Sequence, residues 1–111
     1  MSLRYRGVLP ALLTVLLLPL AQTASADDAK LALGKKVFTE QAMPSCSICH
    51  ALQDAGATGA IGPSLDELKP SAAQVATAVR SGIGVMPAFT ALSDEQVDAV
   101  AHYVATAAGR K

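Results

Sequence analysis

Net charge, cysteines and phosphate-binding motifs are scarce or absent in this sequence, and each absence excludes a class of protein. Nine Lys and Arg residues balance nine Asp and Glu residues, so the basic surface typical of nucleic-acid binding is missing. Two cysteines are too few for a disulfide-rich scaffold. Neither G-x-x-x-x-G-K-[ST] nor G-x-G-x-x-G occurs. A chain of 111 residues, 51% of them hydrophobic, is instead expected to fold as one ordered domain.

The first 26 residues have the pattern of a secretory signal peptide. Two arginines precede the apolar run Val8–Leu20, and a small-x-small cleavage site ends at Ala26. The run is shorter than the about 20 apolar residues that span a bilayer, although retention as a membrane anchor stays an alternative. We therefore expect a signal peptide over residues 1–26 and a mature domain over residues 27–111 in the bacterial periplasm. Losing two of the nine basic residues leaves seven against nine acidic ones, a net charge of −2.

The mature chain has little from which to build a hydrophobic core. Its aromatic residues are Phe38, Phe89 and Tyr103 alone, and alanine occupies 18 positions. Small domains bury a smaller share of their surface than large ones, and they often add a disulfide, a metal or another cross-link. The composition therefore favours a core completed by a non-protein group. A small Ala-rich helical bundle that folds unaided stays an alternative.

Hydrophobic spacing and capping motifs predict an all-α chain. Apolar residues on one face indicate a first helix over about residues 29–41, which Pro44 ends. No run alternates for long enough to predict a strand. Three capping boxes predict the starts of further helices, at Ser64 for a short turn that ends before Pro70, at Ser71 for a helix to about Ser81, and at Ser93 for a last helix that stops near Gly109.

The pentapeptide Cys46-Ser47-Ile48-Cys49-His50 carries the clearest chemistry. C-x-x-C-H is the attachment signature of c-type haem. Two thiols at this spacing can reach two vinyl groups on one side of a porphyrin, and the following histidine is carried onto the iron. A disulfide would leave His50 without a role, a thioredoxin-like pair needs a βαβ context, and structural zinc needs four ligands. We predict one covalent haem c attached through Cys46 and Cys49.

The loop Gly82–Phe89 offers the second axial ligand. Its Met86 follows two glycines, which allow close approach to a porphyrin, and precedes a proline that stiffens the chain. Met43 lies too near the attachment motif to cross easily to the opposite face of a haem. His102 lies within the last predicted helix, at the edge of its apolar stripe, where a structural role is expected. We predict that His50 and Met86 are the axial ligands of the haem iron.

Together these motifs resemble those of the class I monohaem cytochromes c. The resemblance rests on three ordered motifs: Cys46-x-x-Cys49-His50, Gly62-Pro63-x-Leu65 and Met86-Pro87-x-Phe89. It covers residues 27–111 and implies an all-α fold of about four helices around one haem. The first and last helices would cross, with Gly34, Phe38 and Tyr103 matching the residues of that crossing. The family also implies that the carbonyl group of Pro63 accepts a hydrogen bond from His50, which would fix the imidazole tautomer.

A finer resemblance concerns residues 51–70 and the loop Gly82–Phe89. Both are similar to the small cytochrome subunit of periplasmic sulfite dehydrogenases, in which a molybdenum subunit oxidises sulfite and passes electrons to the haem. With two protein ligands the iron has no open position for a substrate, so an electron carrier is expected rather than an enzyme. It would accept electrons from such an oxidoreductase and pass them to a terminal oxidase or another cytochrome. A permanent haem subunit of a heteromeric oxidoreductase and a haem-based sensor stay alternatives.

The partners are expected to be redox proteins that dock at an uncharged haem edge. The residues expected at that edge are Ser47, Ile48, Val85, Pro87 and Ala88. No lysine ring is evident, because Lys30, Lys35 and Lys36 are interpreted as a solvated face of the first helix. We expect a small docking patch with modest salt dependence. The mature protein, without a membrane span, would be a monomer or one subunit of a heterodimer.

Overall fold

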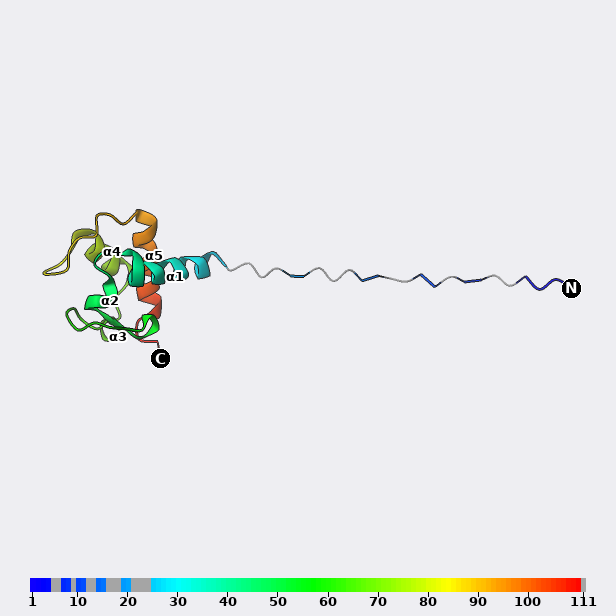
Figure 1. Ribbon diagram of the computed structural model, residues 1–111, viewed down its shortest axis with the longest axis horizontal. Coiled ribbons are helices and arrows are strands. Elements are labelled where there is room, and N and C mark those ends of the chain that lie inside the picture. Colours follow the sequence, from blue (N-terminus) through cyan, green and yellow to red (C-terminus); the bar gives the residue numbers. More distant parts are fainter. Residues whose placement is uncertain (5–6, 9, 12–13, 16–18, 21–24, 111) are drawn as a thin grey trace.

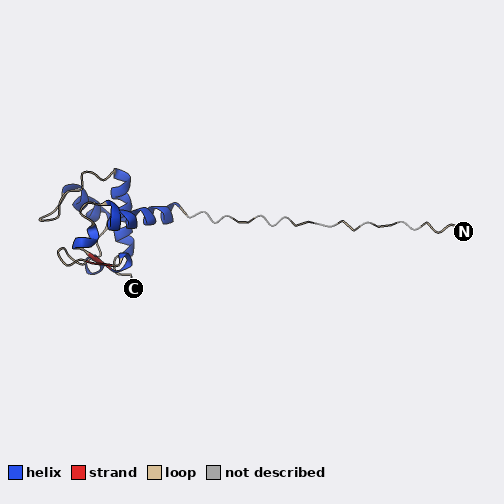
Figure 2. Cartoon of the chain, in the orientation of Figure 1, coloured by secondary structure: helices blue, strands red, loops and turns tan. Residues whose placement is uncertain are grey.

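The part of the chain that the structure describes contains five α-helices, a π-helical turn, a 3-10 turn (Gln53–Ala55) and one short β-hairpin (Figures 1 and 2). The structure is a computed structural model that describes residues 1–4, 7–8, 10–11, 14–15, 19–20 and 25–110. The expected signal peptide over residues 1–26 falls partly outside these residues, and its cleavage site stays a prediction. None of the helices described is both long and apolar enough to cross a bilayer. The elements are α1 (Ala26–Lys36), α2 (Cys46–Cys49), β1 (Ala51–Leu52), β2 (Ala57–Thr58), α3 (Leu65–Leu68), α4 (Ala72–Ser81) and α5 (Asp94–Ala107).

The first and last helices cross, as the family resemblance predicted (Figure 1). Gly34 of α1 is buried against α5, and a Cβ added there would overlap the carbonyl oxygen of Ala99 and the Cβ of Tyr103. The rings of Phe38 and Tyr103 pack edge to face beside this point, with centroids 6.2 Å apart. The absence of a side chain at Gly34 therefore sets how closely the two helices approach.

The first helix begins earlier than expected and ends with a change of geometry. It starts at Ala26 rather than near residue 29, because Ser25 caps it by accepting a hydrogen bond from the Asp28 amide at 3.2 Å. Its last turn, Val37–Gln41, is π-helical. The hydroxyl group of Ser45 lies 3.1 Å from the carbonyl oxygens of both Phe38 and Thr39 in that turn. The end of the first helix is thereby tied to the segment that enters α2.

The prediction that the chain has no strand was wrong for residues 51–58. Strands β1 and β2 pair antiparallel, with Ala51 opposite Thr58 and Leu52 opposite Ala57. Each strand has two residues, which is too short for an alternating pattern to show in the sequence. The expectation of an all-α fold holds for the remaining elements.

Two of the three predicted capping boxes form. Ser71 and Ser93 each accept a hydrogen bond from the amide of the glutamine three residues later, and each glutamine side chain accepts one from the serine amide. The box predicted at Ser64 was wrong, because its side chain makes no capping hydrogen bond. Helix α3 instead carries Asp66, whose carboxylate accepts hydrogen bonds from the amides of Gln53 and Gly109.

The protein core lies along α5 and leaves one side open. The largest fully buried side chains are Phe38, Leu52, Val37, Val100 and Val104. Phe38, Val100 and Val104 also line a cavity on the other side of the crossing. The few large side chains of this chain therefore serve both as its core and as the wall of that cavity.

Candidate haem site

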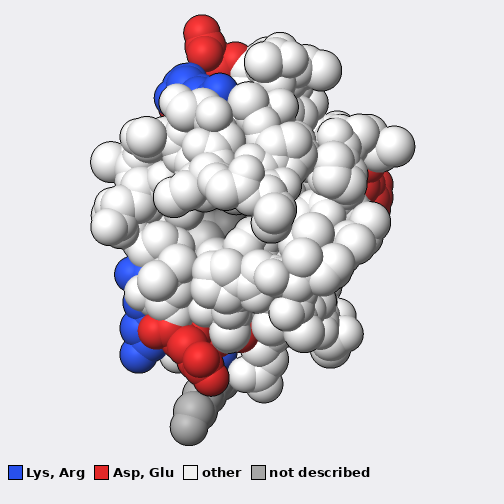
Figure 3. All heavy atoms as spheres, turned by 90° about the vertical axis from the view of Figure 1, so that its left-hand side faces the viewer, with Lys and Arg blue, Asp and Glu red and all other residues white. Residues whose placement is uncertain are grey.

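An apolar cavity of about 630 Å³ lies between α2, α4, α5 and the loop that follows α4. Its volume falls within the range of about 300 to 1,000 Å³ typical of ligand sites. The residues that line it include no Asp, Glu, Lys or Arg. Figure 3 shows a hollow near the centre of one face, surrounded by uncharged residues, with charged side chains at the margin. The cavity is suited to a large apolar group that reaches the surface along one edge.

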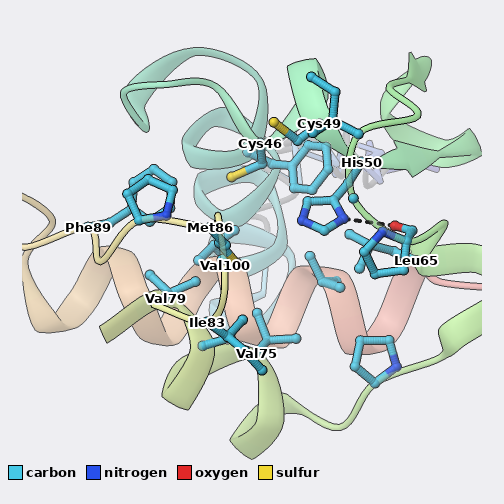
Figure 4. A pocket seen from close by; sticks show the side chains of 18 of the residues that line it. Cys46, Cys49, His50, Leu65, Val75, Val79, Ile83, Met86, Phe89 and Val100 are labelled. Carbon is cyan, nitrogen blue, oxygen red and sulfur yellow. Dashed lines mark hydrogen bonds between the residues drawn. The ribbon is translucent and has the colours of Figure 1, made fainter. Parts of the chain in front are cut away.

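Helix α2 is a single turn that places Cys46, Cys49 and His50 on one wall of this cavity (Figure 4). The amide of His50 still donates to the carbonyl oxygen of Cys46 at 3.0 Å, but the backbone of His50 is extended, with φ −113° and ψ 137°. The chain thus leaves the helix at the histidine. Its ring projects into the cavity beside the two cysteine side chains.

The imidazole of His50 lies against the carbonyl group of Pro63. Nδ1 of His50 lies 2.8 Å from that oxygen (Figure 4). A carbonyl oxygen can only accept, so Nδ1 carries the proton and Nε2 presents a lone pair. Such a bond fixes the tautomer of a metal-ligating histidine. The geometry prepares His50 Nε2 for coordination.

Gly62 contributes to this wall in a way that the sequence did not reveal. A Cβ added to Gly62 would lie 2.6 Å from Cε1 and 2.9 Å from Nδ1 of His50. Its amide donates to the carbonyl oxygen of Cys49 at 2.8 Å. In the sequence this glycine is recognisable only as part of a family motif. Its contact with the imidazole requires the pairing of distant segments, which no local pattern encodes.

Cys46 and Cys49 form no disulfide. Burial raises the pKa of the Cys46 thiol to about 11, so this group is protonated at neutral pH. The segment that carries it is fixed through Ser45, whose hydroxyl group also lies 2.6 Å from that of Ser47. Two cysteine side chains on an apolar wall, next to a histidine, fit the requirements of a covalently attached haem.

Met86 lies on the opposite side of the cavity from His50, in the loop between α4 and α5 (Figure 4). A tight turn positions it, since Ile83 and Met86 exchange two backbone hydrogen bonds of 3.0 and 2.9 Å. The amide of Phe89 then donates to the carbonyl oxygen of Val79 at 2.8 Å, which returns the loop to α4. The loop therefore holds Met86 against the cavity from both ends.

Neither rival ligand lines the cavity. Met43 is 82% exposed, and His102 on α5 places Nε2 2.7 Å from a carboxylate oxygen of Asp27 on α1. In the part of the chain described, no group of three or more His, Cys, Asp or Glu side chains is arranged to hold a metal ion. The donor set at the cavity is thus two thiols, one imidazole and one thioether, which fits a haem with axial His and Met ligands.

Ile48 and Val85, two of the five residues expected at the haem edge, differ in position. Val85 lines the cavity and is 92% exposed, whereas Ile48 is 59% exposed and does not line it. Lys30, Lys35 and Lys36 are all exposed, which fits their interpretation as a solvated face of the first helix. Lys35 also has a partner that the sequence did not reveal. Its ammonium group donates to the backbone carbonyl oxygen of Asp54 at 2.8 Å and lies 3.6 Å from that residue's carboxylate. Lys35 therefore joins α1 to the loop between β1 and β2.

Comparison with known proteins agrees with this geometry. The profile of the family described as "Cytochrome C oxidase, cbb3-type, subunit III" matches residues 29–104. Among solved structures, the c-type cytochrome SorU from Sinorhizobium meliloti is similar, with 56% sequence identity and a TM-score of 0.73. That match covers 74% of this chain and 94% of SorU. Among curated proteins, none matches.

Proposed function

The chain belongs to the cytochrome c family described as cytochrome c oxidase, cbb3-type, subunit III, and from that membership we propose that it is a one-electron carrier with His50 and Met86 as axial ligands. A c-type haem is the cofactor of this family, and Cys46 and Cys49 are the residues of this chain that would hold it. The observation that carries the proposal is the placement of His50 and Met86 on opposite sides of one apolar cavity.

A bound haem supplies one-electron chemistry by cycling between Fe(III) and Fe(II). The residues of this chain contribute orientation and exclusion of water. Pro63 holds the imidazole of His50 in one tautomer, and the turn at Ile83 holds Met86. Apolar walls without charged side chains disfavour the more highly charged state of the iron site. With His50 and Met86 both bound to the iron, no position would stay open for a substrate.

The ligation is tested by replacing Met86. The oxidised protein should show the weak near-infrared band of sulfur-to-iron(III) charge transfer, and Met86→Ala should lose it and lower the reduction potential. Met43→Ala is the matched control and should keep the band, because Met43 is exposed and away from the cavity. Loss of the band in Met43→Ala instead would assign the iron to that residue.

We further propose that the carrier works in the periplasm and accepts electrons from a molybdenum-containing sulfite dehydrogenase. The signal peptide pattern of residues 1–26 supports the compartment. The similarity of residues 51–70 and of the loop Gly82–Phe89 to the cytochrome subunit of such enzymes supports the partner. The uncharged face around the cavity supports a transient redox encounter, which buries a small area (Figure 3).

Stopped-flow reduction tests this role. The oxidised protein is mixed with a sulfite dehydrogenase and sulfite, and haem reduction is followed by absorbance. Fast reduction that requires the enzyme supports the partner. Slow reduction by this enzyme alongside fast reduction by another oxidoreductase would keep the carrier and reject the sulfite link. Turnover of sulfite or peroxide by the isolated protein would contradict the carrier. A stoichiometric complex that survives purification would identify a permanent haem subunit.

A further inference from the structure

Gly82 ends α4 in a backbone conformation that residues with a side chain rarely adopt. Its φ is +69° and its ψ is 165°. This region of positive φ and extended ψ is occupied almost only by glycine. The amide of Gly82 still donates to the carbonyl oxygen of Ala78 at 2.8 Å, so the reversal of chain direction takes place within this one residue.

The space around Gly82 is filled by the backbone of the loop that carries Met86. A Cβ added to Gly82 would lie 2.8 Å from the carbonyl oxygen of Met86 and 2.9 Å from the amide nitrogen of Ala88. The next nearest atom, the carbonyl carbon of Pro87, would lie 3.1 Å away. Backbone atoms held by hydrogen bonds at both ends of the loop cannot move aside as the end of a flexible side chain can.

Gly56, in the loop between β1 and β2, provides the contrast. It also has a positive φ, of +62°, but a Cβ added there would meet no atom within 4 Å, and Gly56 does not line the cavity. An alanine at position 56 would have an unfavourable backbone conformation in open space. An alanine at position 82 would have an unfavourable conformation and would also push the Met86 backbone away from α4.

We propose that Gly82 is a positioning residue for Met86, because its bare Cα lets the Met86 carbonyl group pack against the end of α4 and so places the thioether at the cavity. This inference rests on the proposed ligation by Met86. It assigns to Gly82 a role in the coordination of the iron that is separate from the general need for a turn. The role predicts that Gly82→Ala resembles Met86→Ala rather than Gly56→Ala.

Near-infrared spectra and imidazole titrations of the oxidised holoproteins test the proposal. Gly82→Ala should keep its covalent haem and helical circular dichroism but lose the near-infrared band. Its affinity for imidazole should rise by about tenfold or more, the factor that matches a strain of about 1.4 kcal/mol. Gly56→Ala should keep the band and the wild-type imidazole affinity, because Gly56 lies outside the cavity. Adding Gly82→Ala to Met86→Ala should raise imidazole affinity no further.

Each other result has a defined meaning. An unchanged band and imidazole affinity in Gly82→Ala would overturn the positioning role while leaving the ligation intact. Failure of Gly82→Ala to fold even in saturating imidazole, while Met86→Ala folds, would also overturn it, because the glycine would then serve the fold as a whole. A wild-type protein without the band would instead reject the ligation by Met86 itself.

Discussion

The carboxylate of Asp54 joins residues that are far apart in the sequence. Its Oδ2 accepts a hydrogen bond of 2.6 Å from the hydroxyl group of Tyr103 on α5, and Lys35 on α1 lies 3.6 Å from the same oxygen. The hydrogen bond from Tyr103, helped by the charge of Lys35, lowers the pKa of Asp54. Burial and the bond to Asp54 raise the pKa of Tyr103. The hydroxyl group at the helix crossing is thus satisfied by an ionised acceptor.

Removing the hydroxyl group of Tyr103 should therefore lower the free energy of unfolding by an amount that depends on pH. A carboxyl group with a lowered pKa stabilises the folded state above its unfolded pKa of about 3.8, and this stabilisation is lost as pH falls through the lower folded pKa. Tyr103→Phe should lower the free energy of unfolding at pH 7 by about 1 kcal/mol. This value is low for a hydrogen bond to a charged acceptor, because Asp54 is 42% exposed and water weakens the interaction. Denaturant titrations should show this difference shrinking below pH 3.8.

The control for this prediction is Asp54→Asn. In that background Tyr103→Phe should lower the free energy of unfolding by less. The decrease should not depend on pH between 3 and 7, because the ionisable acceptor is gone. An equal loss of stability at every pH in the wild-type background would show that packing of the ring, rather than its bond to Asp54, determines the effect.

Individual site residues could be predicted where the chemistry is local in the sequence. The spacing of Cys46, Cys49 and His50 indicates haem attachment without knowledge of the fold. The roles of Gly62 and Gly82 could not be predicted, because each depends on backbone that folds against it from another segment. For the same reason the sequence does not reveal the partner of Lys35, which is Asp54, 19 residues further along the chain.

Among the elements, the crossing of α1 and α5 depends most on one position. Gly34→Ala would force a methyl group into the Ala99 carbonyl group and the Cβ of Tyr103. Because the obstacle is helix backbone, the helices must separate, and overpacking of this kind costs about 1 to 3 kcal/mol. The higher helix propensity of alanine offsets at most about 1 kcal/mol of this loss of stability. Thermal unfolding should show a lower midpoint for Gly34→Ala.

Ala32→Gly is the matched control on the same helix. Ala32 is exposed, so this change should cost about 1 kcal/mol from helix propensity alone. A Gly34→Ala variant that is as stable as the wild type or more stable would contradict the close approach of α1 and α5.

Elements with long periodic patterns could be predicted, and the short ones could not. Helices α4 and α5 were expected from apolar stripes and capping boxes that the structure contains at Ser71 and Ser93. The hairpin of β1 and β2 has too few residues for a pattern. At Ser64 the capping motif is present but unused, and the neighbouring Asp66 binds the amides of Gln53 and Gly109. Tertiary contacts outweigh local signals in such short segments.

The molecule as a whole presents an uncharged face around its cavity, with charged side chains at the margin (Figure 3). Val85 lies in the loop on this side and is among the most exposed of the apolar residues described. If partners dock here, Val85→Lys should lower the second-order rate of electron transfer by about tenfold, because the new charge loses water in the contact. Stopped-flow reduction at several salt concentrations measures this effect.

Ala32→Lys supplies the same change of net charge on α1, at an exposed position outside the residues that line the cavity. Its transfer rate should stay close to that of the wild type. Equal slowing in both variants would show that net charge, and not the face around the cavity, controls the encounter.

The central claim is that this chain matures into a protein with one haem attached through Cys46 and Cys49. Intact mass spectrometry of the protein purified from periplasm, under denaturing conditions that release any unattached haem, tests it most directly. The account predicts a single species with the mass of residues 27–111 plus one haem, and Cys46→Ala should lose one of the two links. A mass equal to the polypeptide alone would contradict it.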